Sequence, residues 1–185
     1  MDPSMPSQVS PGILIAHPSL KDPNFEKSVV LLSAYSPSDG AVGVVMNRPS
    51  NRTIGQWTDD FAYTPLERVP VFHGGPVQHD QLILAALDWG SGPGTFRFRF
   101  GLSIEEAMVI LDRDDQTEVR GFMGYSGWSS GQLEAEIRQR AWVPLSVDPS
   151  FMAQLATETL WKSCIRIMNP GPVGLLDFPD DPSLN

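Results

Sequence analysis

The strongest constraint on the fold is a pair of β-branched apolar runs separated by a short turn. Residues 28–35 read SVVLLSAY, residues 41–47 read AVGVVMN, and the segment between them contains Asp39 and Gly40. β-Branched residues favour strands, and an Asp-Gly pair favours the tight turns that join antiparallel strands. The pattern therefore predicts a β-hairpin in the first third of the chain.

Further apolar runs predict additional strands around this hairpin. Residues 95–100 place phenylalanine at every second position, which is the pattern of a half-buried strand. Gly74, Gly75 and Pro76 are residue types typical of turns, and we expect them to join two strands. The strands expected besides the hairpin are Gly12–His17, Val69–His73, Gln81–Leu87, Thr95–Phe100, Glu118–Tyr125 and Trp142–Val147.

Helix signals are fewer and lie between the strands. Ser103 and Glu106 have the spacing of a capping box, which predicts a helix start. Asp148 and Pro149 are a natural N-cap and first helical residue, and apolar residues then recur near helical spacing up to Met168. The expected helices are Thr53–Ala62, Ser103–Leu111, Ser130–Arg140 and a last one that starts after Asp148 and ends before Asn169.

This order of elements predicts a single α+β domain. Many strands, mostly in hairpins, with a few separate helices favour mostly antiparallel β-sheets with several packed helices over a doubly wound sheet. We expect a flexible N-terminus over residues 1–11, one domain over residues 12–176, and a flexible acidic tail over residues 177–185.

Charge and composition narrow the classes of partner. The 185-residue chain has a net charge of −9 and a pI of about 4.6, which disfavours binding to nucleic-acid phosphates. No apolar run is long enough to span a bilayer and no secretory signal precedes the first strand, so we expect a cytoplasmic protein without membrane contact. The single cysteine, Cys164, excludes an internal disulfide and falls on the apolar stripe of the last helix, where we expect inert packing.

The segment GWSSG, residues 127–131, matches the nucleophile-elbow pattern of serine hydrolases. That fold needs its histidine after the serine, whereas His17, His73 and His79 all precede Ser129. Another fold could still use Ser129 with His73 or His79, because a catalytic triad is defined by geometry. The alternative is a structural role, in which Ser129 and Gln132 form a capping box at a helix start.

Four ordered motifs resemble those of the AlgH/YqgE family of bacterial proteins. They are GILIAHPSLKDPNFEKSVVLL at 12–32, GAVGVVMNRP at 40–49, VFHGGPV at 71–77 and GYSGWSSGQLEAEIRQRAW at 124–142. The resemblance implies an α+β fold with coiled, branching β-sheets. It implies no established biochemical function and no catalytic residues. The family name reflects a proposed role in regulating alginate synthesis.

Two segments are candidates for binding an anion. Asn47 and Arg48 end an expected strand, and arginine matches carboxylate and phosphate groups in a bidentate way. The alternative is that Asn47 turns the chain while Arg48 pairs with a surface acid. His73, Gly74 and Gly75 offer backbone amides for an anion nest, and the alternative there is a tight turn.

A third candidate surface surrounds Trp128, Gln132 and Glu134. A tryptophan at a glycine-flanked turn beside a helix N-terminus can form a shallow pocket that favours anions. The alternative is that Trp128 fills the core and Glu134 complements the helix dipole. Glu134 and Glu136 each precede an arginine by four residues, which predicts ion pairs along the helix.

Two further patterns carry weaker signals. His73 and His79 lie near Asp80, but no third ligand stands at a recognised zinc spacing, so we expect no metal site. Arg97 and Arg99 alternate with phenylalanine in the RFRF stripe, which is a pattern for nucleic-acid binding or, alternatively, for a half-buried strand.

These observations favour a non-enzymatic regulatory or binding protein without a cofactor. It would act through a protein partner or a small anionic ligand, with no oligomeric state indicated. The alternatives are a hydrolase that uses Ser129 with an upstream histidine, and a DNA-binding regulator that uses Arg97 and Arg99.

Overall fold

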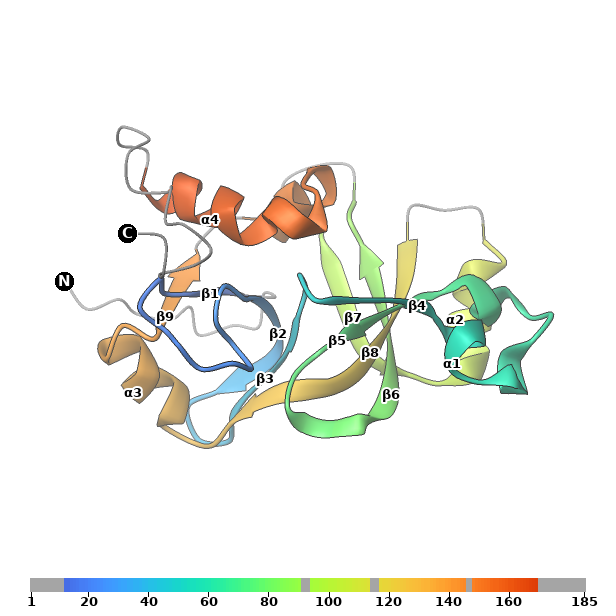
Figure 1. Ribbon diagram of the computed structural model, residues 1–185, viewed down its shortest axis with the longest axis horizontal. Helices are drawn as coiled ribbons and strands as arrows, with labels where there is room; N and C mark the ends of the chain where they lie inside the picture. Colours follow the sequence, from blue (N-terminus) through green and yellow to red (C-terminus); the bar gives the residue numbers. More distant parts are fainter. Residues whose placement is uncertain (1–11, 91–93, 114–116, 146–147, 170–185) are drawn as a thin grey trace, which may run out of the picture.

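A curled sheet of nine strands runs through the protein in the computed structural model, which describes residues 12–90, 94–113, 117–145 and 148–169 (Figure 1). All strand pairs among the described residues are antiparallel except β5 with β8, which confirms an α+β fold with mostly antiparallel sheets. The strands are β1 (Ile13–Ala16), β2 (Val29–Ser36), β3 (Gly40–Val45), β4 (Pro49–Thr53), β5 (Pro70–His73), β6 (Val77–Asp88), β7 (Arg97–Leu102), β8 (Thr117–Trp128) and β9 (Trp142–Leu145).

The long strand β8 joins the two halves of the molecule. Its residues 117–125 pair with β6, and Gly121–Met123 also pair with β5, so β5 and β6 lie on opposite edges of β8. Its last residues, Ser126–Trp128, pair with β3. One half therefore contains β1, β2, β3 and β9, the other contains β4 to β7, and β8 crosses between them (Figure 1).

The first half is buried on both faces of its sheet. Ile13 and Ile15 point into the core cluster that α4 covers, while Leu14 and Ala16 point into the cluster that contains α3. This explains why β1 is apolar at every position, since alternate side chains face opposite layers. Figure 1 shows α4 above β1 and α3 below it.

Except for α2, the α-helices are shorter than the sequence pattern predicts. The α-helices are α1 (Ile54–Trp57), α2 (Ile104–Leu111), α3 (Gln132–Arg138) and α4 (Leu160–Met168). Four 3-10 turns accompany them: η1 (Asp59–Phe61), η2 (Pro65–Arg68), η3 (Pro149–Gln154) and η4 (Thr157–Thr159).

The hairpin and the start of α2 agree with the predictions. β2 pairs with β3 across the Asp39-Gly40 turn, and Gly40 has the positive φ of 97° that favours glycine. Ser103 caps α2, accepting the amide of Glu106, whose carboxylate accepts the amide of Ser103 in return. Both features depend on local chemistry, which is why the sequence pattern was sufficient.

Two expected helices are broken in the structure. The prediction of one helix over Thr53–Ala62 is wrong, because Thr53 ends β4 and only α1 and η1 follow. The last helix is also divided. Asp148 does cap its first turn, but Leu155 and Ala156 have extended backbone, with ψ of 135° and 139°. The core contacts of the apolar stripe were nevertheless predicted correctly, since Met152, Leu160, Cys164 and Ile165 are all buried in one cluster.

The Gly74-Gly75-Pro76 segment is a crossing rather than a hairpin turn. β5 and β6 do not pair with each other, and the segment between them passes across β8. A Cβ atom on Gly74 would lie 2.3 Å from the carbonyl oxygen of Gly124, and one on Gly75 would lie 2.3 Å from that of Tyr125. Glycine is therefore required here by close backbone approach.

Some expectations fall outside the described residues, namely those for residues 1–11 and 170–185, which include the acidic tail. Among the described helices, none combines the length and the apolar character that crossing a membrane requires.

Candidate functional site

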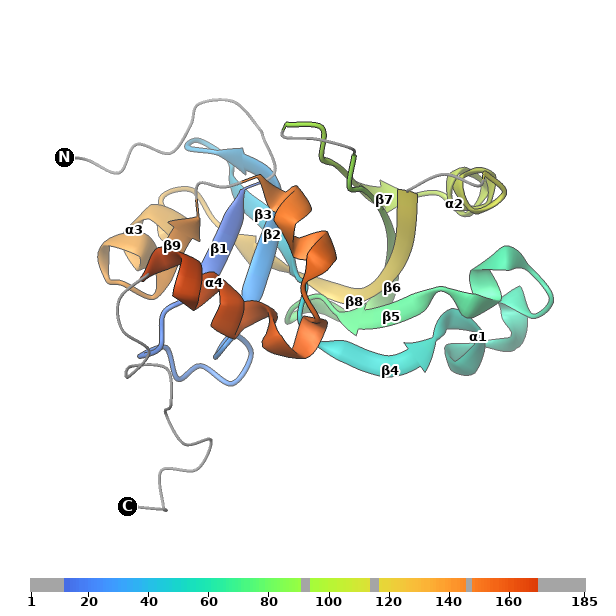
Figure 2. The same cartoon turned by 90° about the horizontal axis from the view of Figure 1, so that it is seen from above.

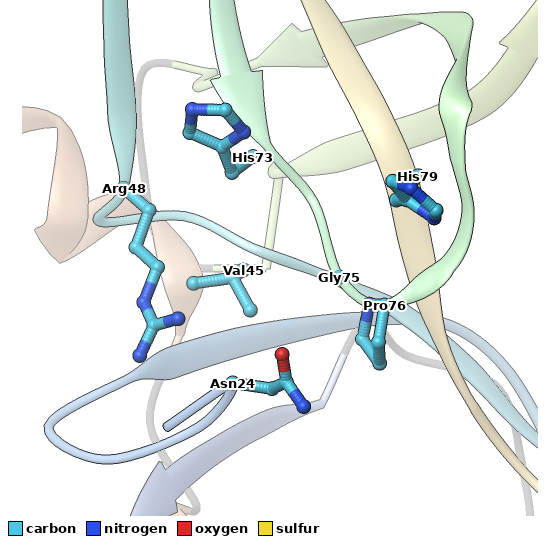
Figure 3. A pocket seen from close by; sticks show the side chains of 7 residues that line it. All are labelled: Asn24, Val45, Arg48, His73, Gly75, Pro76 and His79. Atoms are coloured by element: carbon cyan, nitrogen blue, oxygen red, sulfur yellow. The ribbon is translucent and has the colours of Figure 1, made fainter.

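A cleft of about 430 Å³ lies where the two halves meet, beside the crossing segment. Figure 3 shows its labelled side chains placed around Val45. They come from the loop before β2, from the end of β3 and the loop that follows it, and from the crossing segment with the two strands that flank it. The lining residues are Asn24, Val45, Arg48, His73, Gly75, Pro76 and His79, and we call this site the Arg48 cleft.

Arg48 is held in place by the loop before β2. Its guanidinium donates to the carbonyl oxygens of Pro23 and Glu26, both at 3.1 Å. Among the described residues, Arg48 forms no ion pair with an acid. A guanidinium has five N–H donors, so these two bonds leave donors for a ligand.

Asn47 has a structural role next to Arg48. Its Oδ1 accepts the amide of Val29 at 2.9 Å, and its Nδ2 donates to the carbonyl of Lys27 at 2.9 Å. Both ends of the amide are therefore used in fixing the loop to β2. Asn47 does not line the cleft, so it shapes the site without facing it.

The crossing segment places the two histidines. His73 ends β5, with its amide bound to the carbonyl of Arg48 at 2.9 Å, and His79 lies early in β6. The carbonyl of Gly74 accepts the amide of Val45 at 2.9 Å and the hydroxyl of Ser126 at 3.1 Å. Gly74 is thus buried beneath the cleft, and only Gly75 of the expected glycine pair lines it.

The chemistry of the Arg48 cleft favours an anion. Arginine, two imidazoles and an asparagine amide all provide N–H donors. Among the described residues that line the cleft, none carries a carboxylate. In a chain of net charge −9, such a local set of donors is an electrostatic exception, and anions would accumulate there.

Most polar atoms of the expected surface around Trp128 are bonded within the protein. Trp128 is only 5% exposed and its Nε1 donates to Glu136 at 2.8 Å, although the residue also lines a pocket of about 500 Å³. Gln132 accepts the amide of Ser129 at 3.0 Å and donates to Glu136 at 2.9 Å. Its polar atoms are therefore satisfied within the protein.

Glu134 is likewise engaged. It accepts the hydroxyl of Tyr35 at 2.7 Å. This hydrogen bond, together with burial and the nearby negative charge, raises the pKa of Tyr35 from 10.0 to about 12. The expected helical ion pairs of Glu134 and Glu136 do not appear among the described salt bridges, because both carboxylates accept hydrogen bonds from aromatic side chains instead.

Ser129 contacts Gln132 at the start of α3, as the structural alternative predicts, but it is not the N-cap. Its hydroxyl donates to Oε1 of Gln132 at 3.1 Å. The N-cap of α3 is Gly131, with φ of 74°, so Ser129 is not the N-cap. Gln132 does reach back to the amide of Ser129, which is half of the expected capping box. In the described part of the chain, no hydrogen bond joins Ser129 to a histidine.

The RFRF stripe is a half-buried edge strand. Arg97 and Arg99 are exposed, whereas Phe98 and Phe100 pack against the main core cluster. β7 pairs with β6 alone among the described strands, which accounts for the alternation. Within the described residues, no group of three or more His, Cys, Asp or Glu side chains is placed to hold a metal ion.

Two functional features were missed or undervalued by the sequence pattern. Asn24 lines the cleft, although it lies far along the chain from Arg48 and His73. The Asp-Pro-x-Phe sequence that contains Asn24 lies in one of the family motifs, but the sequence did not indicate which distant residues Asn24 would lie beside. His79 was considered only as a metal ligand or a base, because the crossing that brings it to the cleft is a tertiary feature.

Comparison with known proteins shows that this chain is similar to a family of bacterial proteins. The family model described as AlgH-like matches residues 13–172. A UPF0301 protein from Streptomyces coelicolor is 34% identical over 187 residues, covering 97% of this chain and 96% of the relative. One from Thermobifida fusca is 35% identical over 188 residues, covering 94% of each.

Solved structures agree with these matches. The solution structure of the AlgH protein from Pseudomonas aeruginosa has a TM-score of 0.65 at 28% identity, covering 90% of this chain and 93% of that one. A crystal structure of a protein from Corynebacterium diphtheriae has a TM-score of 0.63 at 21% identity, covering 94% of this chain and 93% of that one. The second likeness concerns the fold alone.

Proposed function

This chain belongs to the AlgH-like family, and we propose that it acts as a non-enzymatic binding protein whose Arg48 cleft takes a small anionic ligand. The observation that carries the proposal is the meeting of Arg48, His73 and His79, from separate segments, in one cleft whose described lining has no carboxylate. The ligand would be bound through the oxygen atoms of a carboxylate or phosphate group.

A binding role agrees better with the described side chains than a catalytic one. The hydroxyl of Ser129 is bound to Gln132, and the thiol of Cys164 is buried, which raises its pKa to about 12. A thiol with such a pKa is a poor nucleophile near neutral pH. We also propose a cytoplasmic location, because a free buried cysteine suits a reducing compartment.

The position of the cleft supports a regulatory role. Asn24 belongs to the loop before β2, in the first half, whereas His73 and His79 flank the crossing in the second half. A ligand bound by both sides would stabilise one arrangement of the halves over others. Such a differential interaction is what a conformational response to a ligand requires.

Titration of the labelled protein with inorganic phosphate and with succinate tests the proposal. Amide chemical shifts should change at Val45, Gly75 and His79, and one of the two probes should bind more tightly, which identifies the anion class. Replacing both cleft histidines (His73→Gln with His79→Gln) should weaken binding at least about fivefold, as expected from the loss of roughly 1 kcal/mol of hydrogen bonding. Both side chains are exposed, so the fold should survive.

The remaining histidine provides a matched control. His17 bonds to Ser19, away from the cleft lining, and His17→Gln should leave the affinity unchanged. Equal weakening in both variants, or shifts that avoid the cleft, would show that the anions bind nonspecifically and would refute the proposal.

A further inference from the structure

The end of the molecule formed by α1, η1, η2 and α2 exposes a concentration of large apolar side chains. We call this the α1–α2 end; it comprises residues 54–68 and 101–113 (Figures 1 and 2). Among the described residues, five large hydrophobic side chains are exposed, and four of them lie here. They are Trp57 at 41%, Tyr63 at 100%, Ile104 at 44% and Val109 at 51%. Exposed apolar groups gathered in this way are typical of interaction surfaces.

An apolar groove of about 330 Å³ opens on the same end. Its floor consists of the buried Ile54, Leu66 and Leu84, while Phe61 and Ile104 stand at its sides. The described residues that line it are all apolar. A groove of this kind accepts apolar side chains that project at intervals from a partner segment, as an amphipathic helix presents them.

Four acidic residues are next in sequence to residues that line this groove. Asp59 and Asp60 directly precede Phe61, and Glu105 and Glu106 directly follow Ile104. All four are exposed. The α1–α2 end contains six acidic and two basic residues, so it carries a net negative charge. Complementary charge around an apolar contact selects a basic partner.

The charge argues against the other occupants. A second copy of this chain would bring the same acids to the contact, and like charges placed opposite one another are unfavourable. An anionic membrane surface and a nucleic acid are disfavoured for the same reason. We propose that the groove of the α1–α2 end docks a basic amphipathic segment of a protein partner, with its apolar face in the groove and its lysines or arginines beside the four acids.

A designed peptide probe tests this proposal on the full chain. The peptide has roughly four helical turns, with leucines on one face and lysines on the other; its counterpart has glutamates in place of the lysines. The lysine peptide should shift the amide signals of Ile83, Gly101 and Ile104. The glutamate peptide should bind at least about tenfold more weakly, because its charges repel the rim.

Two matched variants locate the contact. Ile104 and Ile167 are exposed to 44% and 45%, but Ile167 lies on α4, outside the α1–α2 end. Ile104→Ser should weaken binding of the lysine peptide at least about tenfold, as truncation of a central contact does. Ile167→Ser should leave the affinity for this peptide unchanged. Thermal unfolding of both variants checks that each remains folded.

Three results would overturn the proposal. Equal affinity for the two peptides would show that charge plays no part, and equal effects of Ile104→Ser and Ile167→Ser would place the contact elsewhere. Concentration-dependent self-association of the protein that Ile104→Ser removes would identify a second copy as the occupant.

Discussion

Single polar side chains in this protein are used mainly to hold neighbouring segments together. Glu134 illustrates this, because its place at a helix start was compatible with a binding surface. In the structure its carboxylate accepts the hydroxyl of Tyr35, a residue 99 positions away along the chain. A sequence pattern gives the residue type and the local element, but the partner depends on which strand passes beside the helix.

The Tyr35–Glu134 pair has a measurable consequence in alkaline solution. The pKa of Tyr35 is raised from 10.0 to about 12, so the folded protein holds this proton more tightly than the unfolded chain does. Its contribution to stability is therefore fully present below pH 10 and is lost as the pH rises towards 12. Tyrosinate absorbance should show one late-titrating group, which Tyr35→Phe removes.

The Glu134→Gln variant is the control for the cause of this shift. It removes the negative charge but keeps an acceptor oxygen, so the late titration should move to lower pH. A Tyr35 titration that is the same in Glu134→Gln as in the unmodified protein would contradict the assigned cause.

Among the elements, α3 shows how a short helix is fixed to a sheet. Oε2 of Glu136 accepts Nε1 of Trp128 and Nε1 of Trp142, each at 2.8 Å. The two indoles are almost fully buried and meet edge to face, with Phe25 against both. One carboxylate thus connects the helix to β8 and β9.

Removal of this carboxylate should destabilise the protein strongly. Glu136→Ala deletes three charge-assisted hydrogen bonds, from Trp128, Trp142 and Gln132, and leaves two buried indole N–H groups without their partner, so we expect a loss of about 3 kcal/mol or more in the free energy of unfolding. Glu136→Gln keeps an acceptor and should lose about half as much. Urea denaturation measures the loss, and near-UV circular dichroism reports the packing of the two tryptophans.

The exposed Glu105 on α2 provides a comparison. Glu105→Ala should change stability by less than about 0.5 kcal/mol, as surface substitutions usually do. Similar losses in Glu105→Ala and Glu136→Ala would show that the indole contacts contribute little.

The elements that the sequence predicted best are those defined by neighbouring residues. The β2–β3 hairpin and the capped start of α2 are of this kind. The last helix was less predictable, since its apolar spacing was compatible with continuous helix, whereas Leu155 adopts extended backbone between Met152 and Leu160 while all three pack on the same cluster. Packing against the sheet overrides local propensity there.

At the scale of the whole molecule, the crossing of residues 74–76 over β8 determines both the fold and the cleft. Gly124 lies at the centre of this contact with φ of 68°. A Cβ atom there would lie 2.6 Å from the carbonyl oxygens of Gly75 and Val77, and 2.8 Å from Cα of His79. These are backbone atoms, so the crossing cannot accept a side chain without moving the segment that carries His79.

Two glycine variants separate backbone conformation from crowding. Gly101 also has a positive φ, of 80°, but a Cβ atom there would meet nothing within 4 Å. Gly101→Ala should therefore lower the free energy of unfolding only by the cost of a positive φ at a residue with a Cβ atom, about 1–2 kcal/mol. Gly124→Ala carries the same term and the steric conflict, so it should be far more destabilising or prevent folding, as thermal unfolding would show. Equal losses in the two variants would contradict the close crossing.

The sequence by itself determined the positions of most strands, the caps and turns, the apolar stripes and the family likeness. These depend on residues a few positions apart, whose spacing is visible in the chain. Only the tertiary structure decided that β5 and β6 flank β8, that Trp128 is buried, and that Asn24, Arg48 and His79 share a cleft. The physical reason is that strand pairing and burial are set by the packing of segments far apart in the chain, and several arrangements satisfy the same local pattern.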